Sequence, residues 1–240
     1  MMKVAQCWDD GTATDARVVE ILRKYKAKAT FNLCPGVMEE KRIVPFWNSF
    51  SEEKSWSNKG FHCGRIGINE LIDVYGDFQV ASHCWKHESV GREANEVFFQ
   101  AAMDARKFLE DIFQRECRGF AWPNGAHSPE TERMLSNAGF RYGRTVENVN
   151  DVTLCDDPMH LAPTCHFMDG NFLQKYQDAK KTGVFYFWGH TYEMFEYDMF
   201  WKRYEEMIKF ITEDTEAEWV DVIDLVPLCK GAGNISKKNI

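Results

Sequence analysis

Short apolar runs rich in β-forming residues alternate with longer amphipathic segments along most of this chain. Residues 4–8 and 29–33 read as strands, and residues 15–26 between them carry apolar side chains at helical spacing. Parallel neighbouring strands need a crossover connection, usually a helix, so this alternation predicts an α/β fold with a parallel sheet. About seven such units occur without a glycine-rich nucleotide-binding motif. We therefore expect a barrel-like α/β fold rather than an open dinucleotide-binding sheet.

The same pattern predicts the remaining elements. The sequence Ser128-Pro129 predicts the start of a helix that ends near Gly139, because serine caps a first turn and proline is favoured at the first helical position. Further strands are expected at 78–81, 119–122, 140–144, 159–162, 184–188 and 219–226, and further helices at 69–75, 94–113 and 199–211.

The segment 35–65 has weak periodicity and is expected to form an elaborated loop over one end of the fold. Its aromatic side chains either stack against sugar rings or form a small core within the loop, and the second reading is slightly favoured. These side chains are Phe46, Trp47, Phe50, Trp56 and Phe61.

Length and charge limit the class of protein. At 240 residues the chain can bury a sizeable core, and we expect one domain over residues 1–230 followed by a polar tail at 231–240. The 37 acidic and 29 basic residues give a formal charge of −8, which argues against nucleic acid or an anionic membrane as a partner. The sequence shows no signal peptide, no membrane span and no CxxC pair among its eight cysteines, so we expect reduced thiols and a cytoplasmic location.

Polar side chains follow four of the predicted strands, at the point where each strand ends. Active groups of parallel α/β folds collect at the carboxyl ends of the strands, so these side chains are expected to lie on one rim. In chain order they are Asp9 and Asp10, His83 and His87, Asn124, and His190.

Two histidines and one carboxylate leave open positions for water and a substrate oxygen, as a hydrolytic metal site requires. A second carboxylate nearby can take a proton, and His190 is the natural acid because an ordinary histidine titrates at about pH 6.5. Each motif alone has an ordinary explanation: the aspartate pair can form a turn, and the histidines can be solvated or bonded to the backbone. Their common placement at strand ends favours a metal-dependent catalytic site. Cys84 is a less favoured ligand, because thiolates usually occur in multiples at zinc sites.

These residues resemble four motifs of the polysaccharide deacetylases, the NodB-type carbohydrate esterases of family 4. The first motif, an aromatic residue followed by Asp-Asp-Gly, matches residues 8–11. The second, His-x-x-x-His after a small hydroxyl residue, matches residues 82–87, while residues 120–125 resemble the third and residues 188–190 the fifth. The resemblance implies an irregular (β/α)7 barrel of the NodB-homology, or glycoside hydrolase–deacetylase, type.

The resemblance also implies roles for individual residues. Asp9 would be the catalytic base, His190 the acid, and the backbone N–H of Asn124 would bind the oxyanion. We further assign substrate contacts to Trp122, Pro123 and Tyr192. The metal ligands would be Asp10, His83 and His87, holding most simply Zn²⁺, with Co²⁺, Ni²⁺, Fe²⁺ or Mn²⁺ as alternatives.

The chain departs from the family pattern at two places. Ala121 stands where the family has an arginine that orients the base. Arg118 begins its strand, about 13 Å from the rim, whereas Arg144 ends the next strand, so we predict that Arg144 pairs with Asp9. The family aspartate that tunes the acid histidine has no clear match. The candidates are Glu147, Asp151, Asp157 and Glu193. His166 also follows a strand, so it either reaches the rim or is satisfied within its loop, and the second reading is favoured. The same reading is favoured for His127, just before the expected helix cap.

The sequence therefore predicts a metal-dependent hydrolase that removes an acetyl or other acyl group from the nitrogen of an N-acetylated sugar or related carbohydrate. Two alternatives stay open. One is an amidohydrolase for a small non-sugar amide, and the other is a carbohydrate-binding protein that keeps the fold without turnover. The missing arginine favours the second alternative, and the lack of a secretion signal makes a small intracellular amide as suitable as a polymer.

Overall fold

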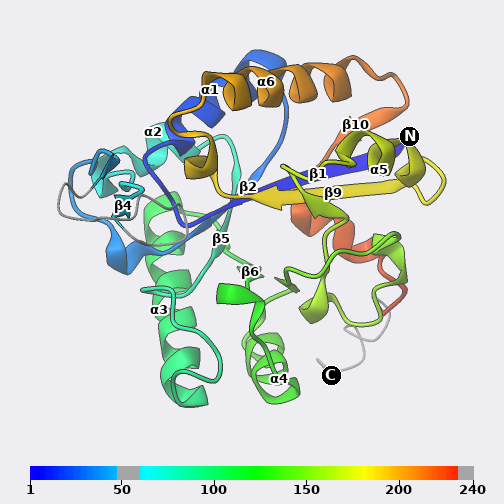
Figure 1. The fold of residues 1–240 in the computed structure, drawn as a ribbon. Coiled ribbons are helices and arrows are strands. Elements are labelled where there is room, and N and C mark those ends of the chain that lie inside the picture. Colours follow the sequence, from blue (N-terminus) through cyan, green and yellow to red (C-terminus); the bar gives the residue numbers. More distant parts are fainter. Residues whose placement is uncertain (48–59, 232–240) are drawn as a thin grey trace.

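One curled parallel sheet carries the fold in the computed structural model, which describes residues 1–47 and 60–231 (Figure 1). Its strand order is β7-β6-β5-β2-β1-β9-β8, and β10 also pairs with β1. Within the described residues no ladder joins β7 to β8, so the barrel stays open there. The expected (β/α) barrel-type fold is confirmed. The strands are β1 (Met2–Asp9), β2 (Thr30–Leu33), β5 (Gln79–Ser82), β6 (Gly119–Ala121), β7 (Tyr142–Arg144), β8 (Cys165–His166), β9 (Val184–Gly189) and β10 (Ala217–Trp219).

Helices cover the outside of this sheet. Figure 1 shows α1 and α6 together on one side of β1 and β9, and α3 and α4 beyond β5 and β6. The α-helices are α1 (Asp15–Tyr25), α2 (Leu71–Tyr75), α3 (Asn95–Phe113), α4 (Pro129–Asn137), α5 (Phe172–Ala179) and α6 (Asp198–Glu213). Short 3₁₀ helices are η1 (Pro35–Val37), η2 (Ile68–Glu70), η3 (Pro123–Gly125), η4 (Val152–Leu154), η5 (Pro158–His160), η6 (Thr191–Met194) and η7 (Val222–Leu228).

Strand β1 separates two hydrophobic cores, because successive side chains of a strand point to opposite faces. Val4 and Trp8 pack in the core shared with α1 and α6, and Trp8 meets Tyr204 of α6 edge to face. Ala5 and Cys7 belong to the second core, which η7 completes. Asp9 shares the parity of these two residues, so the alternation of β1 carries its carboxylate toward the inside of the half-barrel.

Two of the expected strands are wrong. Residues 159–162 form η5 and a single bridge between Leu161 and Arg144, because the Asp157 side chain accepts from the Met159 N–H and starts a turn. Of the expected strand 219–226, only Trp219 lies in a strand, at the end of β10, and the chain then turns into η7, where the Asp221 N–H donates to the Asp224 carboxylate at 3.1 Å. The expected start of α4 is confirmed by the Ser128 side chain, which accepts from the Thr131 N–H.

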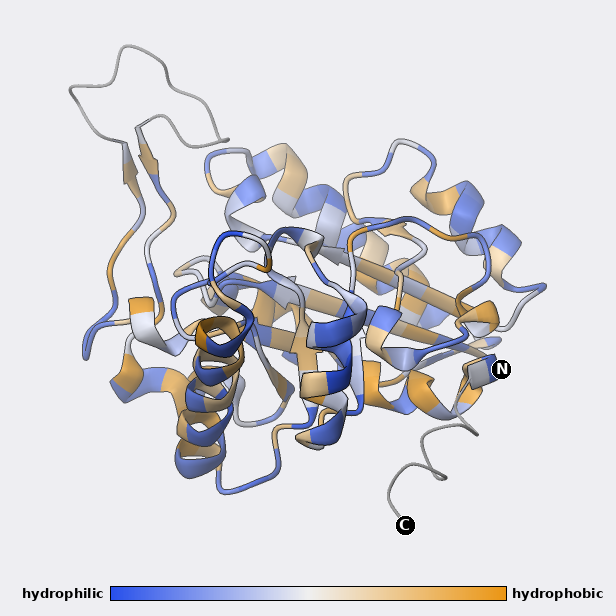
Figure 2. Cartoon of the chain, turned by 90° about the horizontal axis from the view of Figure 1, so that it is seen from below, coloured by the Kyte–Doolittle hydropathy of each residue, from blue (hydrophilic) through white to orange (hydrophobic). Residues whose placement is uncertain are grey.

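A short antiparallel hairpin, β3 (Phe46–Trp47) and β4 (Phe61–His62), projects from the body of the fold within the expected loop region (Figure 2). Phe46 stacks on the His62 ring with centroids 4.8 Å apart, and Trp47 meets Phe61. The pair also contacts the segment after β9, because Phe61 packs against Phe195 at 5.6 Å and the Trp47 indole donates to Glu196 at 2.7 Å. Phe50, Trp56 and all but the first residue of the expected tail at 231–240 lie outside the described residues.

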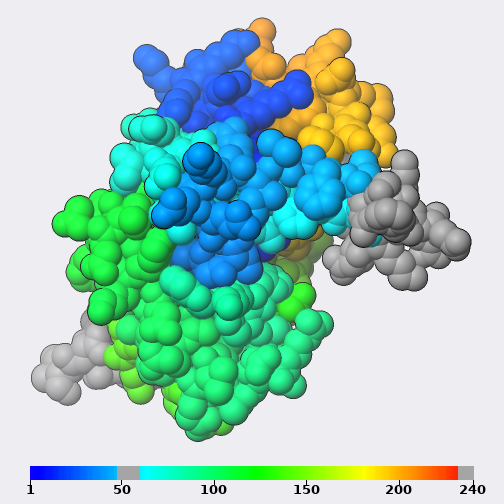
Figure 3. All heavy atoms as spheres, turned by 90° about the vertical axis from the view of Figure 1, so that its left-hand side faces the viewer, coloured from blue at the N-terminus to red at the C-terminus, as the bar shows by residue number. Residues whose placement is uncertain are grey.

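Figure 3 shows that the blue segment following β2 lies between the α1 and α6 layer and the green atoms of α3.

No described helix has the length and apolar character needed to cross a membrane.

Candidate metal and catalytic site

The expected rim residues come together at the carboxyl edge of the sheet. Asp9 is the last residue of β1 and Arg144 the last of β7, while His83 directly follows β5 and His190 directly follows β9. Every ladder of this sheet is parallel, so these strand ends share one edge. The rim placement that the strand pattern predicted is therefore present in the structure.

Asp9 is a buried carboxylate with two strong partners, and only 2% of its surface is exposed. Its Oδ1 accepts from the Asn32 Nδ2 at 2.7 Å, and its Oδ2 accepts from the Arg144 guanidinium. Burial acts to raise the pKa of Asp9, but the charge of Arg144 and the Asn32 bond hold it well below its usual range. Asp9 is thus ionised at neutral pH.

Arg144 reaches Asp9 from β7, the strand at one end of the sheet order, and only 1% of its surface is exposed. Its guanidinium also lies over the Trp188 ring, 4.7 Å from the centroid. The predicted contact between Arg144 and Asp9 is present. Whether it replaces the family arginine in catalysis stays a prediction.

Asp10 turns away from Asp9 because the backbone leaves the strand at this residue, with φ of 80°. The Asp10 Oδ1 lies 3.7 Å from the His83 Nε2 and 4.0 Å from the His87 Nε2. Two further residues here, Cys84 and His87, also have positive φ. Such strained backbone persists where the surroundings over-determine it, and it is concentrated at functional sites.

His83 is oriented by the backbone of β6. Its Nδ1 lies 2.8 Å from the Ala121 carbonyl oxygen, to which it donates, so the lone pair is on Nε2, which faces Asp10. Burial lowers the pKa of His83 to about 4. His83 is therefore neutral at neutral pH, which is the state that a metal ligand requires.

The donor set of Asp10, His83 and His87 fits a divalent metal. Metal–ligand bonds in a tetrahedral zinc site place neighbouring ligand atoms roughly 3.4 Å apart. The two separations from Asp10, 3.7 Å to His83 and 4.0 Å to His87, exceed this value by less than 1 Å. Two imidazoles and one carboxylate also leave coordination positions for substrate.

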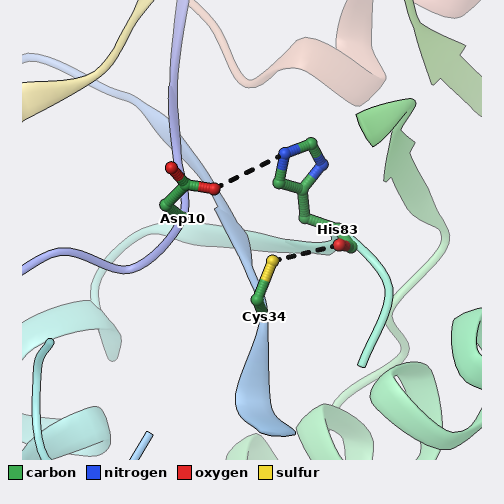
Figure 4. A group of neighbouring side chains, drawn as sticks. All are labelled: Asp10, Cys34 and His83. Carbon is green, nitrogen blue, oxygen red and sulfur yellow. Dashed lines mark hydrogen bonds and ion pairs between the residues drawn. The ribbon is translucent and has the colours of Figure 1, made fainter. Parts of the chain in front are cut away.

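Cys34 is a residue of this site that the sequence reasoning missed. It follows β2, and its Sγ donates to the His83 carbonyl oxygen at 3.0 Å. Donor atoms of Asp10, Cys34 and His83 all lie within 4.8 Å of one another, and Figure 4 shows them facing a common space. Burial holds the pKa of the Cys34 thiol well above its usual value, so it is protonated here. Its position after a strand end was the signal that could have found it.

His190 lies on the other side of Asp9, with its Nε2 3.9 Å from the Asp9 Oδ2. Its Nδ1 faces the Glu193 Oε1 at 3.6 Å, an ion-pair contact longer than a hydrogen bond. Burial acts to lower the pKa of His190, but Glu193, Asp9 and Asp10 outweigh it and raise the pKa to about 9. His190 is therefore protonated at neutral pH.

Glu193 is the acidic residue that faces His190, among the four that the sequence left open. Its Oε2 also lies 3.1 Å from the His166 Nε2 and accepts from the His190 backbone N–H at 3.1 Å. Burial acts to raise the pKa of Glu193, but these two histidines lower it. The other three candidates lie elsewhere: Glu147 lies 4.0 Å from His160, and Asp151 and Asp157 cap η4 and η5.

The residues expected to bind substrate differ in exposure. Trp122 is fully buried, and its indole N–H donates to the Met159 carbonyl oxygen at 2.8 Å, so its side chain offers no surface to a substrate. Pro123 is also buried. Asn124 is exposed at the turn of η3 with φ of 57°. Tyr192 is half-buried, and its ring centroid lies 5.1 Å from that of His190.

Solved structures of several enzymes share this fold. They include an acetyl xylan esterase of family 4 from Clostridium thermocellum in complex with a cobalt ion (16% identity over 94% of this chain and 91% of that chain, TM-score 0.56). A second is a T48 deacetylase with substrate (12% identity over 95% of this chain and 92% of that chain, TM-score 0.58). A third is the peptidoglycan deacetylase PdaC of Bacillus subtilis, mutant D285S (16% identity over 100% of this chain and 98% of that chain, TM-score 0.53). A search of curated proteins gave no match. The family model described as polysaccharide deacetylase matches residues 2–143, more than half of the chain. This chain belongs to the polysaccharide deacetylase family.

Proposed function

We propose that this protein is a divalent-metal-dependent hydrolase that removes an acetyl group from the nitrogen of an N-acetylated carbohydrate. One observation carries the proposal: the donors of Asp10, His83 and His87 converge beside an ionised Asp9 and a protonated His190. Family membership supports deacetylation, and so do the names of the structures that share the fold.

The three donor residues hold the metal, and Zn²⁺ suits a set of two imidazoles and one carboxylate. When bound, a divalent cation supplies a Lewis acid for the acyl carbonyl. A cobalt ion in the related acetyl xylan esterase supports a divalent metal without selecting zinc.

Asp9 orients the attacking water and receives its proton. Asn32 and Arg144 fix both carboxylate oxygens, so the base has one orientation when substrate arrives. Because its pKa is held low, Asp9 is ionised when substrate arrives, and it gives up the proton readily after the transfer. We assign oxyanion binding to the backbone N–H of Asn124, which lies in an exposed turn after β6.

His190 donates a proton to the departing amine. An amine leaves poorly as an anion, so cleavage of a C–N bond depends on such an acid. Glu193 keeps His190 protonated and in position, and His166 holds the second oxygen of Glu193. These contacts favour an N-acyl substrate over a simple ester, and a small non-sugar amide would use the same residues.

A cytoplasmic location remains part of the proposal. All eight cysteines are free, which supports a reducing compartment.

The test is an acetate-release panel on the zinc-loaded protein, with acetylated chito-oligomers, acetylated xylan and small acetylated amides as substrates. We expect acetate from the chito-oligomers, and loss of both bound metal and activity in Asp10→Ala and His87→Ala. The exposed His62→Ala is the matched control and should keep both. Release from small amides alone would select the amidohydrolase. Saturable sugar binding with no acetate release would select the binding protein, and unchanged metal content in both ligand variants would reject the ligand assignment.

A further inference from the structure

We propose that His127, Glu132 and His160 form a second divalent-metal site, distinct from the catalytic one, with the Glu147 carboxylate close enough to join it. Donor atoms of the first three residues all lie within 4.8 Å of one another. The site shares no residue with the catalytic donor set and is independent of the proposed reaction.

The geometry brings two imidazoles and a carboxylate into one small space. The His127 Nδ1 lies 2.6 Å from the Glu132 Oε1, and the rings of His127 and His160 meet edge to face with centroids 4.2 Å apart. The Glu147 Oε2 lies 4.0 Å from the His160 Nε2. Zinc ligand atoms lie roughly 3.4 Å apart, so closure onto an ion needs shifts of about 1 Å, mostly in side chains that are not fully buried.

Two separately anchored segments supply these donors. His127 immediately precedes the Ser128 cap of α4, and its ring packs against Trp122 at 5.7 Å. Glu132 lies in the first turn of the same helix, where its N–H donates to the Ser128 carbonyl oxygen at 2.9 Å. The backbone that carries His127 and Glu132 is therefore fixed before any ion binds.

His160 is held just as firmly by the backbone of η5. Its N–H donates to the Asp157 carbonyl oxygen at 2.8 Å. On either side of it, Met159 accepts from the Trp122 indole at 2.8 Å and Leu161 donates to the Gly143 carbonyl oxygen at 2.9 Å. A convergent and anchored donor set of this kind lowers the entropy that metal binding would otherwise lose.

The charges also favour a cation over a simple ion pair. Imidazoles bind metals in their neutral form, so Glu132 and Glu147 leave the donor set with two negative charges that a divalent cation neutralises. Glu132 already bonds to His127, but the His160 side chain has its nearest carboxylate at 4.0 Å and is 47% exposed. Imidazole and carboxylate together suit Zn²⁺ and its neighbours rather than Ca²⁺ or Mg²⁺.

The position of the site gives the second metal a structural role. It lies beyond β6 and β7, whereas the catalytic donors follow β1 and β5. A metal there ties α4 to η5 across the segment that follows η3. It therefore braces the turn that carries Asn124, three residues before His127.

Zinc stoichiometry of the full chain tests the proposal in a background that lacks the catalytic site, Asp10→Ala/His87→Ala. Equilibrium dialysis against Zn²⁺ followed by elemental analysis should give one zinc per chain in this background and none after His160→Ala is added. Zinc should also raise the Tm of the background variant and leave that of the triple variant unchanged. His62→Ala in the same background is the matched control and should keep the zinc.

A background variant that is folded by circular dichroism and binds no zinc would overturn the proposal. Equal zinc content with and without His160→Ala would overturn it as well. If His160→Ala does not fold, Glu132→Gln replaces it and should lower the zinc affinity at least tenfold; an unchanged affinity would again contradict the site.

Discussion

Replacing Arg144 with methionine should strongly destabilise the fold, because the Asp9–Arg144 pair is almost fully buried. The exposed side-chain fractions are 1% for Arg144 and 3% for Asp9. Within the described residues, the Nε and Nη1 atoms of Arg144 are buried without a hydrogen-bond partner, so Asp9 provides most of the charge compensation. Removing one partner of such a pair leaves an uncompensated buried charge, and we expect Arg144→Met to lower the free energy of unfolding by about 3–5 kcal/mol.

The loss should depend on pH. In the native protein the pKa of Asp9 lies below its unfolded value of about 4, so the pair stabilises the fold above that pH and this contribution is lost on acidification. Without Arg144, burial raises the pKa of Asp9 above the unfolded value, and the variant loses stability as the pH rises. The difference in the free energy of unfolding between the native protein and Arg144→Met should therefore widen from about pH 4 to about pH 7.

Urea unfolding of both proteins at about pH 4 and about pH 7 measures this difference. Both are kept in chelator, so that no metal charge contributes. Asp9→Asn/Arg144→Met is the matched control and should recover much of the loss, because neither charge is left buried. A loss below about 1 kcal/mol at both pH values would refute the reasoning, and so would additive effects of the two substitutions.

Three further outcomes follow from the site. Glu193→Gln should lower the pKa of His190 and move the descending limb of the pH–rate profile, expected near pH 9, to lower pH; an unmoved limb would exclude Glu193 as the positioning residue. His87→Ala should lower the affinity of the catalytic metal at least tenfold in a competition assay with a zinc chelator, while Cys34→Ser should change it little. A large loss of affinity in Cys34→Ser with little change in His87→Ala would instead identify Cys34 as the ligand. Gly11 has φ of 67°, so Gly11→Ala should lower the free energy of unfolding by about 1–2 kcal/mol, and an unchanged urea midpoint would contradict the strain.

Sequence periodicity located most of the rim because parallel strands end at a common edge. Asp9, His83 and His190 were found by this rule, and Arg144 was found by the same rule once Ala121 left the family position empty. These residues are set by local strand patterns, which the sequence displays directly.

Other features depend on contacts between distant segments and could not be predicted in this way. Trp122 follows a strand end like the true rim residues, yet its ring stacks against Phe98 of α3 and is fully buried. The apolar run at 222–226 resembles a strand, but a capping box at Asp221 and Asp224 turns it into η7. Glu193 faces His190 only through the geometry of η6, which no periodicity encodes.

Cys34 shows a different reason for failure. It satisfies the strand-end rule, but a single thiol among eight scattered cysteines gave no ligand pattern. Its proximity to His83 is set by the pairing of β2 with β5, which is a tertiary contact.

Acetate release from an N-acetylated chito-oligomer, measured before and after metal removal, tests the central claim most directly. The zinc-loaded protein should release acetate, the chelated protein should release none above background, and added Zn²⁺ should restore the activity. Acetate release that survives complete metal removal, or none from the zinc-loaded protein, would contradict a metal-dependent deacetylase built on Asp10, His83 and His87.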